Sequence, residues 1–176
     1  MSGHNKWSKI KHKKAADDAK KSKVFSKFAR LLTLESKKAG GNASAPSLRS
    51  VINQAKAVNM PSTNIERAIK KGTEKEAGAL EEVVYEAYGP GGSALIITGL
   101  TDNKNRSAAE TKHTLSKYSA SLSAPGSAAW AFEKKESEWI PKTTIPLPQE
   151  DMDKLDKLIR ELEDNDDVQN VYTNTN

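Results

Sequence analysis

The residues with the most evident chemistry lie at the start of the chain. The stretch GHNKWSKIKHKKAADDAKKSK (3–23) holds eight lysines and two aspartates, with one tryptophan and two histidines. Lysines that neutralise phosphates release counterions, which gives salt-dependent binding with little sequence preference. Trp7, His4 and His12 could stack on unpaired bases, or the lysines could be merely solvated and Trp7 packed against a helix. The charge density favours a polyanionic partner, and lysine in place of arginine favours backbone contacts over base readout.

A second group of candidates lies in NIERAIKKG (64–72). In a helix-turn-helix protein this segment would be the recognition helix, in which Asn64 and Arg67 could read bases and the two lysines could contact phosphates. Together with the basic start of the chain, the predicted nucleic-acid-binding residues are His4, Lys6, Trp7, Lys9, Lys11, His12, Lys13, Lys14, Lys20, Lys21, Lys23, Asn64, Arg67, Lys70 and Lys71.

Two loops could face a partner. GPGG (89–92) lacks the G-K-[ST] ending of a phosphate-binding loop and stands between two predicted strands, so a tight hairpin is favoured. TDNKNR (101–106) follows a strand and opens a helix, where Asn103 or Asn105 could cap the helix, or the helix N-terminus could hold an anion beside Arg106. The partner-facing candidates are Tyr88, Gly89, Pro90, Gly91, Gly92, Asp102, Asn103, Asn105 and Arg106.

No catalytic or metal-binding pattern stands out. The histidines His4, His12 and His113 are scattered, and the chain has no cysteine. EDNDD (163–167) lacks the glycine and the final glutamate of a calcium-binding loop, so it is interpreted as the end of an acidic helix. We therefore expect no enzymatic activity, no cofactor, no metal and no small-molecule substrate.

Charge is divided unevenly along the 176 residues. Residues 1–75 carry 18 Lys and Arg against 5 Asp and Glu, whereas residues 76–176 carry 10 against 18. This asymmetry predicts a basic helical domain over 1–75 and an acidic α+β domain over 76–176. No apolar run approaches the ~20 residues of a membrane helix, and the start of the chain does not resemble a secretory signal, so a cytoplasmic protein is expected.

Apolar spacing predicts three helices in the first domain, over 13–38, 47–58 and about 62–72. Gly40 is expected to end the first helix. Thr63 and Glu66 have capping-box spacing for the third, and Gly72 is a candidate for the residue that follows its end. Three helices with short connections indicate a small bundle.

The second domain is predicted to alternate strands and helices. Strands are expected at 82–88, 93–101, 127–133, 143–147 (an edge strand) and 168–174, and helices at 105–119 and 150–164. In the strand 127–133, Ala128, Trp130 and Phe132 would share one face. The order β-β-α-β-β-α-β, with a mostly antiparallel sheet, predicts a sandwich-like α/β domain and an α+β multidomain chain overall.

Five ordered motifs resemble the YebC/PmpR family, which includes the mitochondrial translational activator of cytochrome c oxidase. They are GHNKWSKIKHKKAADDAKKSKVFSK, AKAVNMPSTNIERAIKKG, YEAYGPGG, LTDNKNR and LEDNDDVQNVY. The resemblance extends over nearly the whole chain and implies a three-helix N-terminal domain followed by α/β domains. It also implies a role in gene expression. Bacterial members are described as probable DNA-binding transcriptional regulators, and mitochondrial and bacterial members also resemble translation factors that help the ribosome through stretches such as consecutive prolines.

The chain departs from the family pattern mainly at FEKKESEWIPK (132–142). Typical members insert a third domain here, and in this chain it is missing near 133–139. Lys9 stands where asparagine is usual, and Ser47 replaces an arginine in APSLR. Functions that need the inserted domain are therefore not implied.

The sequence thus favours a nucleic-acid-binding regulator, and specifically a ribosome-associated translation factor that binds rRNA. In this hypothesis residues 4–23 and the NIERAIKKG helix clamp RNA, and the two loops face the working site. The alternative is a DNA-binding transcriptional regulator. A protein-interaction adaptor would leave the basic first domain unexplained. No dimerisation element stands out, so a monomer is expected, without a membrane partner.

Overall fold

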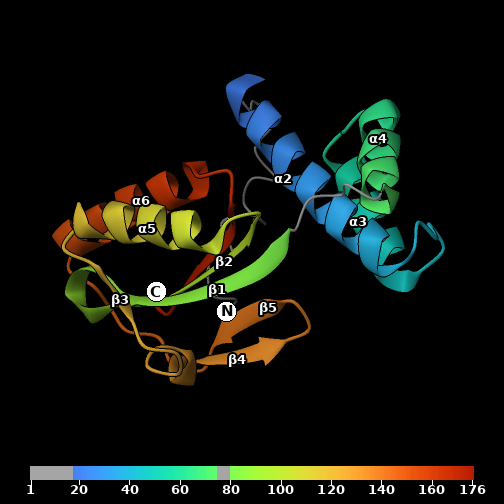
Figure 1. Cartoon of the computed structure of the whole chain (residues 1–176). Helices are drawn as coiled ribbons and strands as arrows, with labels where there is room; N and C mark the ends of the chain where they lie inside the picture. Colours follow the sequence, from blue (N-terminus) through green and yellow to red (C-terminus); the bar gives the residue numbers. More distant parts are fainter. Residues whose placement is uncertain (1–17, 75–79) are drawn as a thin grey trace. The chain divides into compact units, whose positions relative to one another are not determined.

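The structure is a computed structural model that describes residues 18–74 and 80–176 (Figure 1). They form two compact units. The helical unit comprises residues 18–74, 80–81 and 100–102, and the α+β unit comprises residues 82–99 and 103–176. The predicted domain boundary at 75/76 and the first five residues of the predicted helix 13–38 lie outside the described residues, so both stay predictions.

Three helices make up the helical unit: α2 (Asp18–Lys38), α3 (Pro46–Ala57) and α4 (Ser62–Thr73). Their apolar stripes meet in a core that includes Phe28 and Leu32 of α2 and Leu48 of α3, each at most 1 % exposed. After α2 the chain turns through Gly40, whose φ of 58° is the left-handed conformation expected at a helix end. The three-helix prediction is confirmed.

Helices α2 and α4 approach each other closely. The Thr33 hydroxyl donates to the Ala68 carbonyl oxygen at 3.2 Å, and the Ser36 hydroxyl donates to the Ile69 carbonyl oxygen at 2.7 Å. Gly72 lies at the contact, where an added Cβ would be 2.5 Å from the Thr33 carbonyl oxygen. Gly72 was predicted to follow the end of α4, but it lies inside the helix and is buried, because its role is to let the helices meet.

The predicted capping box at Thr63 and Glu66 is also wrong. Helix α4 begins at Ser62, one residue before Thr63, and its N-cap is Pro61, without a side-chain capping bond. Proline suits this position, because its fixed φ is compatible with entry into a helix. Thr63 therefore lies in the first turn, where it cannot serve as the cap.

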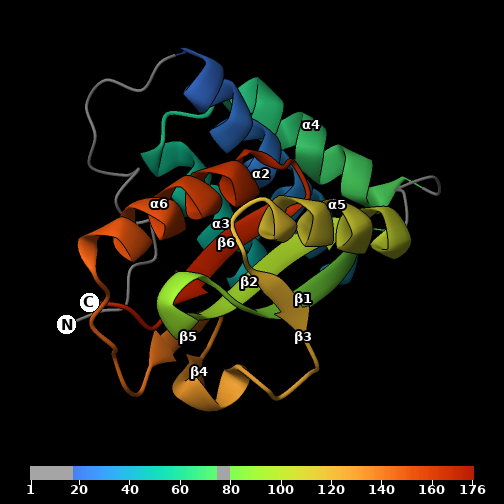
Figure 2. The same cartoon turned by 90° about the vertical axis from the view of Figure 1, so that its left-hand side faces the viewer.

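The α+β unit is built on a four-stranded sheet in the order β3-β1-β2-β6. Strand β2 pairs antiparallel with β6, and β1 pairs antiparallel with β3. Helices α5 and α6 cover one face of this sheet (Figures 1 and 2), and their apolar residues join those of the strands in one core. The elements are β1 (Glu81–Tyr88), β2 (Ala94–Thr101), α5 (Lys104–Ser116), β3 (Ser121–Ser123), α6 (Gln149–Asp164) and β6 (Val168–Thr173).

A short turn and a hairpin cover the other face of the sheet (Figure 1). The 3-10 turn η2 (Ala129–Ala131) leads into strands β4 (Phe132–Lys135) and β5 (Glu138–Pro141). Phe132 packs with Ile96 and Tyr172 of the sheet. Lys135 pairs with Glu138, so Glu136 and Ser137 alone form the turn where the missing domain was predicted.

Two predicted strands differ from the structure. The segment 127–133 was expected to be one strand with Ala128, Trp130 and Phe132 on the same face, but a turn precedes β4, and Trp130 is 60 % exposed whereas Ala128 and Phe132 are buried. The segment 143–147 forms only an isolated bridge between Ile145 and Thr175. The α+β class with a mostly antiparallel sheet is confirmed, with β3 and β5 as additional strands. No helix among the described residues is long and apolar enough to cross a membrane.

Candidate nucleic-acid interface

The predicted cationic residues fall into three groups. Those from His4 to Lys14 lie outside the described part of the chain, so the structure leaves their role a prediction. Lys20 and Lys21 are exposed on the first turns of α2, and Lys23 is half-buried there. The last group lies on α4.

Helix α4 presents a basic face. Arg67, Lys70 and Lys71 are exposed, and their i, i+3 and i+4 spacing places them on one side of the helix. Asn64 is half-buried, so its amide is less accessible than the sequence suggested. The two lysines also lie in the last turn, where the helix dipole favours positive charge.

Further cations lie close to this face, and they were not among the nucleic-acid-binding residues predicted from the sequence. Lys37 and Lys38 are exposed at the end of α2, and the last turn of α4 packs beside that end through Gly72. The first turn of α2 is about 26 Å away along its axis, at 1.5 Å per residue. The described candidates thus form two basic clusters at opposite ends of α2.

A groove opens between α3 and α4 within the helical unit. Its volume is about 430 Å³, and it runs along two turns of each helix. Ile65 of α4 is buried at its floor, and Ile52 and Ile69 are half-buried beside it. The polar lining residues are Ser44, Arg49, Asn53, Lys56, Ser62 and Glu66.

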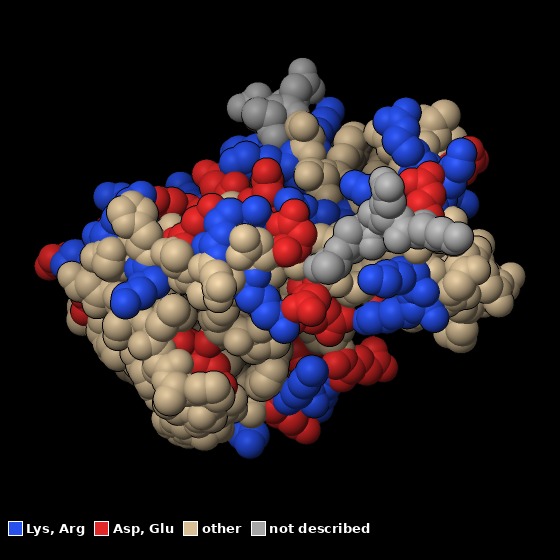
Figure 3. Space-filling view, viewed as in Figure 1, with Lys and Arg blue, Asp and Glu red and all other residues tan. Residues whose placement is uncertain are grey.

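Positive charge dominates the surface of these helices. Residues 18–74 contain twelve Lys and Arg against four Asp and Glu, and on the face shown in Figure 3 basic side chains gather over α2 and α4. Lys38 is paired with Glu35 at 3.0 Å. Arg49 and Lys56 are exposed and make no side-chain hydrogen bond or ion pair to any residue in 18–74 or 80–176, so both cations are available to a ligand.

The YGPGG loop is integrated into the α+β unit. Gly89 donates its amide to the Ser93 carbonyl oxygen at 2.8 Å, which closes the hairpin predicted between β1 and β2. Pro90 is buried, and a Cβ on Gly91 would lie 2.5 Å from Leu147 and 3.2 Å from the carboxylate of Asp151. Close contact with α6 and with the loop before it therefore explains why Gly91 has no side chain. A Cβ at Gly92 would meet no neighbouring atom within 4 Å.

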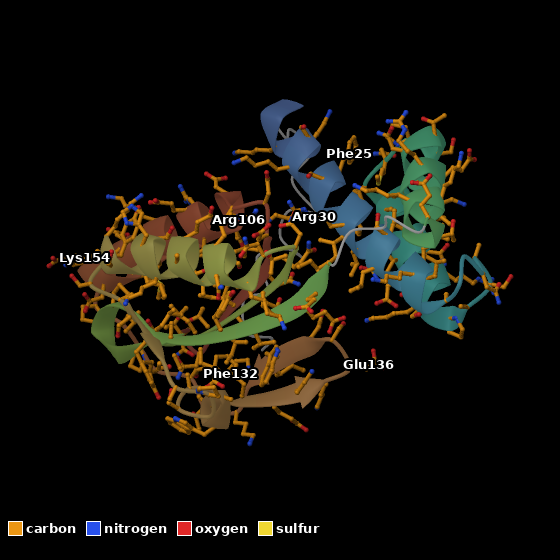
Figure 4. The ribbon with its side chains drawn as sticks, viewed as in Figure 1. Phe25, Arg30, Arg106, Phe132, Glu136 and Lys154 are labelled. Atoms are coloured by element: carbon orange, nitrogen blue, oxygen red, sulfur yellow. The ribbon has the colours of Figure 1, made fainter. Side chains whose placement is uncertain are left out.

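The TDNKNR loop begins α5 and is tied to the acidic motif EDNDD. Of the two asparagines predicted as possible caps, Asn103 caps the helix by accepting from the Arg106 amide at 3.0 Å. The Arg106 guanidinium binds the carboxylate of Asp167 at 3.0 Å, and Asn165 donates to Glu110 at 2.8 Å (Figure 4). Because Arg106 already neutralises a carboxylate that is only 4 % exposed, it is less suited to bind an external anion than the sequence implied.

The two loops do not come together. One precedes β2 and the other follows it, so the eight residues of the strand separate them by about 26 Å at roughly 3.3 Å per residue. A single small site cannot include both.

The segment just before β4 carries the exposed Trp130. The carboxylate of Glu86 accepts hydrogen bonds from the amides of Gly126, Ala128 and Ala129 at 2.7–2.8 Å. Burial acts to raise the pKa of the Glu86 carboxyl, but these three hydrogen bonds lower it, and the net pKa lies below the usual value. The Trp130 indole donates to the Tyr88 hydroxyl at 3.1 Å, which fixes the ring. Tyr88, a partner-facing candidate, therefore supports this loop.

The described residues contain no group of three or more His, Asp or Glu that could hold a metal ion. The acidic side chains of α6 instead form local pairs, such as Glu150 with Lys154 at 2.7 Å (Figure 4). The hydrogen bond to Lys154 and its charge lower the pKa of Glu150. The ion pairs and hydrogen bonds of the α+β unit described above thus connect elements of that unit to one another, whereas the exposed cations Arg49 and Lys56 of the helical unit have no such partner among the described residues.

Comparison with family models matches almost the whole chain. The N-terminal domain model of TACO1/YebC proteins matches residues 5–75, and the model of the TACO1/YebC second and third domains matches residues 80–137 and 133–175. The two pieces of the second match meet at the β4–β5 hairpin, where the inserted domain was predicted to be missing.

Curated relatives are named probable transcriptional regulatory proteins. One from Petrotoga mobilis is 52 % identical over 157 residues, and the match covers 88 % of this chain but only 61 % of the relative's length. One from Thermosipho africanus is 40 % identical over 235 aligned positions, covering 99 % of this chain and 93 % of the relative. Because the chain has 176 residues, at least 59 of those positions have no counterpart in it, as expected for a short form.

The fold also matches a solved structure. A conserved hypothetical protein from Aquifex aeolicus superposes with a TM-score of 0.86 and 32 % sequence identity, covering 97 % of this chain and 96 % of that chain. Helices followed by an α/β domain are therefore shared with an experimentally determined protein.

Proposed function

We propose, from the premise that the chain belongs to the TACO1/YebC family, that it is a nucleic-acid-binding regulator of gene expression. The names of its relatives point to a regulatory rather than a catalytic role. More specifically, we propose a monomeric, cytoplasmic translation factor that binds RNA on the ribosome through the helical unit.

The observation that carries this proposal is the cationic surface of the helical unit. Exposed cations occur on all three helices, and those of α3 are unpaired among the described residues. Lysine predominates over arginine, which suits contacts to a phosphate backbone more than bidentate recognition of guanine. Folded RNA offers closely spaced phosphates and unpaired bases together, and the α3–α4 groove adds an apolar surface beside the cations.

Sequence-selective DNA binding is the second candidate. Helices α3 and α4 are joined by the short segment 58–61, a connection of the length found in helix-turn-helix motifs, and α4 carries Arg67 on its exposed side. The names of the relatives favour this reading. Against it, Asn64 is half-buried, and a recognition helix needs exposed base-reading side chains in its first turns.

Cosedimentation with ribosomes, at moderate and raised salt, tests the proposal alongside a gel-shift assay on promoter-length DNA. We expect ribosome binding that survives competition by bulk RNA, and DNA binding that ignores sequence. Charge reversal at both Lys70 and Lys71, or at Lys11, Lys13 and Lys14, should abolish ribosome binding. The matched control reverses Lys112 and Lys157, two exposed lysines of the α+β unit.

The outcomes separate the candidates. Selective DNA shifts without ribosome association would establish the transcriptional alternative. Ribosome binding that survives charge reversal in both sets of helical-unit lysines would contradict binding through this unit. Sedimentation of the free protein as a dimer would contradict the proposed monomer.

A further inference from the structure

The groove between α3 and α4 combines an apolar floor with a polar, cationic rim. Ile52, Ile65 and Ile69 form the floor, and the unpaired cations Arg49 and Lys56 lie on α3. We propose that this groove binds an unpaired nucleobase of a single-stranded RNA segment, with the two cations on the neighbouring phosphates. This inference rests on the proposed RNA-binding function and assigns it a specific site.

The size of the groove fits a nucleotide. Its volume of about 430 Å³ lies near the lower end of the ~300–1,000 Å³ that small-ligand sites occupy. A docked protein helix would need a larger apolar surface, since a standard protein interface buries about 800 Å² on each partner. Three isoleucines, two of them already half-buried, leave too little apolar surface for such a partner.

The positions of the cations match a strand that lies across the groove. Arg49 and Lys56 are seven residues apart on α3, which is two helical turns and about 10 Å along the axis. Ile52 lies between them on the side that lines the groove. A base placed on the isoleucines would therefore have a cation on either side of it, as a polyanionic strand with one base turned inward requires.

The remaining rim residues give the groove a preference among bases. The Glu66 carboxylate only accepts hydrogen bonds, whereas the Asn53 amide can donate and accept. A carboxylate favours the exocyclic amine of adenine, cytosine or guanine. Uracil has no exocyclic amine, and its single ring N–H donor lies between two carbonyl oxygens that would repel the carboxylate. The groove is thus expected to prefer an amine-bearing base over uracil.

Binding of short single-stranded RNA to the full chain, followed by fluorescence anisotropy, tests this site. We expect the wild-type chain to bind oligo-adenylate roughly 10-fold more tightly than oligo-uridylate. Glu66→Gln should reduce that ratio to nearly one, whereas Glu74→Gln should leave it unchanged. Glu74 is exposed just after α4 and does not line the groove, so this control removes the same charge.

Two further variants distinguish the contribution of contacts to the base from that of contacts to the phosphates. Arg49→Ala should weaken binding of all oligonucleotides alike and reduce the slope of log affinity against log salt by about 1. Ile52→Ser should weaken adenylate binding roughly 10-fold with the salt slope unchanged, because it removes apolar contact and no charge. Circular dichroism of each variant checks that the helices remain folded.

The results distinguish failure of the site from failure of the function. If the chain binds no RNA at any salt concentration, both proposals fall. If it binds RNA tightly but without base preference, and neither Ile52→Ser nor Glu66→Gln changes binding, the RNA function stands and the base site is overturned. Displacement of the RNA by an acidic amphipathic peptide at a lower concentration than competing RNA would also overturn it, in favour of a protein ligand.

Discussion

Replacement of Gly72 by alanine provides a strong test of how α2 and α4 are held together. The new Cβ would lie 2.5 Å from the Thr33 carbonyl oxygen and 2.7 Å from the Ser36 Cβ. The Thr33 oxygen belongs to the backbone of α2 and cannot rotate away. The helices must therefore separate by up to about 1 Å to restore ordinary contact distances.

Two opposing effects determine the size of the change. Alanine favours a helix interior over glycine by about 1 kcal/mol. Overpacking costs about 1–3 kcal/mol. Separation also stretches the hydrogen bonds from Thr33 to the Ala68 carbonyl oxygen and from Ser36 to the Ile69 carbonyl oxygen, at about 1 kcal/mol each. The steric effect should prevail, with a net loss of about 2–4 kcal/mol in the free energy of unfolding.

Urea unfolding of the full chain, followed by hydrogen exchange of peptides from each helix, measures this loss in the helical unit separately. Lys71→Ala changes the neighbouring exposed position and should alter stability by less than about 0.5 kcal/mol. A Gly72→Ala chain as stable as the wild type, with unchanged exchange in α2 and α4, would refute the steric argument, because helix propensity would then have decided the outcome.

Three further predictions concern the α+β unit. The pKa of Glu86 is lowered in the folded state, so its stabilising contribution should be present above the unfolded pKa of about 4.3 and be lost as pH falls through the folded pKa. Hydrogen exchange at Gly126–Ala129 should accelerate over that pH range. Glu86→Gln should remove this pH dependence. Burial raises the pKa of Tyr172 to about 12, so its contribution should persist below pH ~10 and be lost as pH rises towards 12, which an ultraviolet titration compared with Tyr172→Phe would detect. Glu136→Gly should raise stability by about 0.5–1 kcal/mol in thermal unfolding, because the φ of Glu136 is 54° and glycine adopts this conformation without strain; a lower melting temperature would contradict this.

Long, periodic elements could be predicted from the sequence. Helices α2, α3, α4 and α6 follow apolar stripes that recur every three or four residues, and their ends fall within a few residues of the expected positions. Strands β1, β2 and β6 are similarly evident, because β-branched and aromatic residues concentrate in them. Asn103 was recognised as a possible helix cap because it stands at the point where a strand ends and a helix pattern begins.

Features that depend on contacts distant in sequence could not be predicted. Strand β3 is only Ser-Leu-Ser, and it is a strand because Leu122 pairs with Ala87 of β1. Gly72 has the sequence context of a helix end, and only the approach of α2 shows its packing role. Arg106 was identified as a candidate for anion binding, but its partner Asp167 lies 61 residues further along the chain.

The candidate site illustrates the same difference. Lysine density was readable from the sequence, and Lys20, Lys21, Lys70 and Lys71 are indeed exposed. The α3–α4 groove could not be predicted from the sequence, because residues of both helices line it and no local pattern specifies how the two helices pack. The spacing of Arg49, Ile52 and Lys56 on one side of a helix was the available signal.

The two-residue turn between β4 and β5 is a site at which the α+β unit could accept an inserted sequence. Paired residues at the ends of antiparallel strands lie about 5 Å apart, so a folded insert with adjacent termini could replace Glu136 and Ser137 without parting the strands. The entropic cost of a longer connection rises by only about 0.6 kcal/mol per doubling of its length. A fluorescent reporter or an affinity tag could be carried there, and a lineage could gain or lose an entire domain in one genetic event while the remaining chain folds as before.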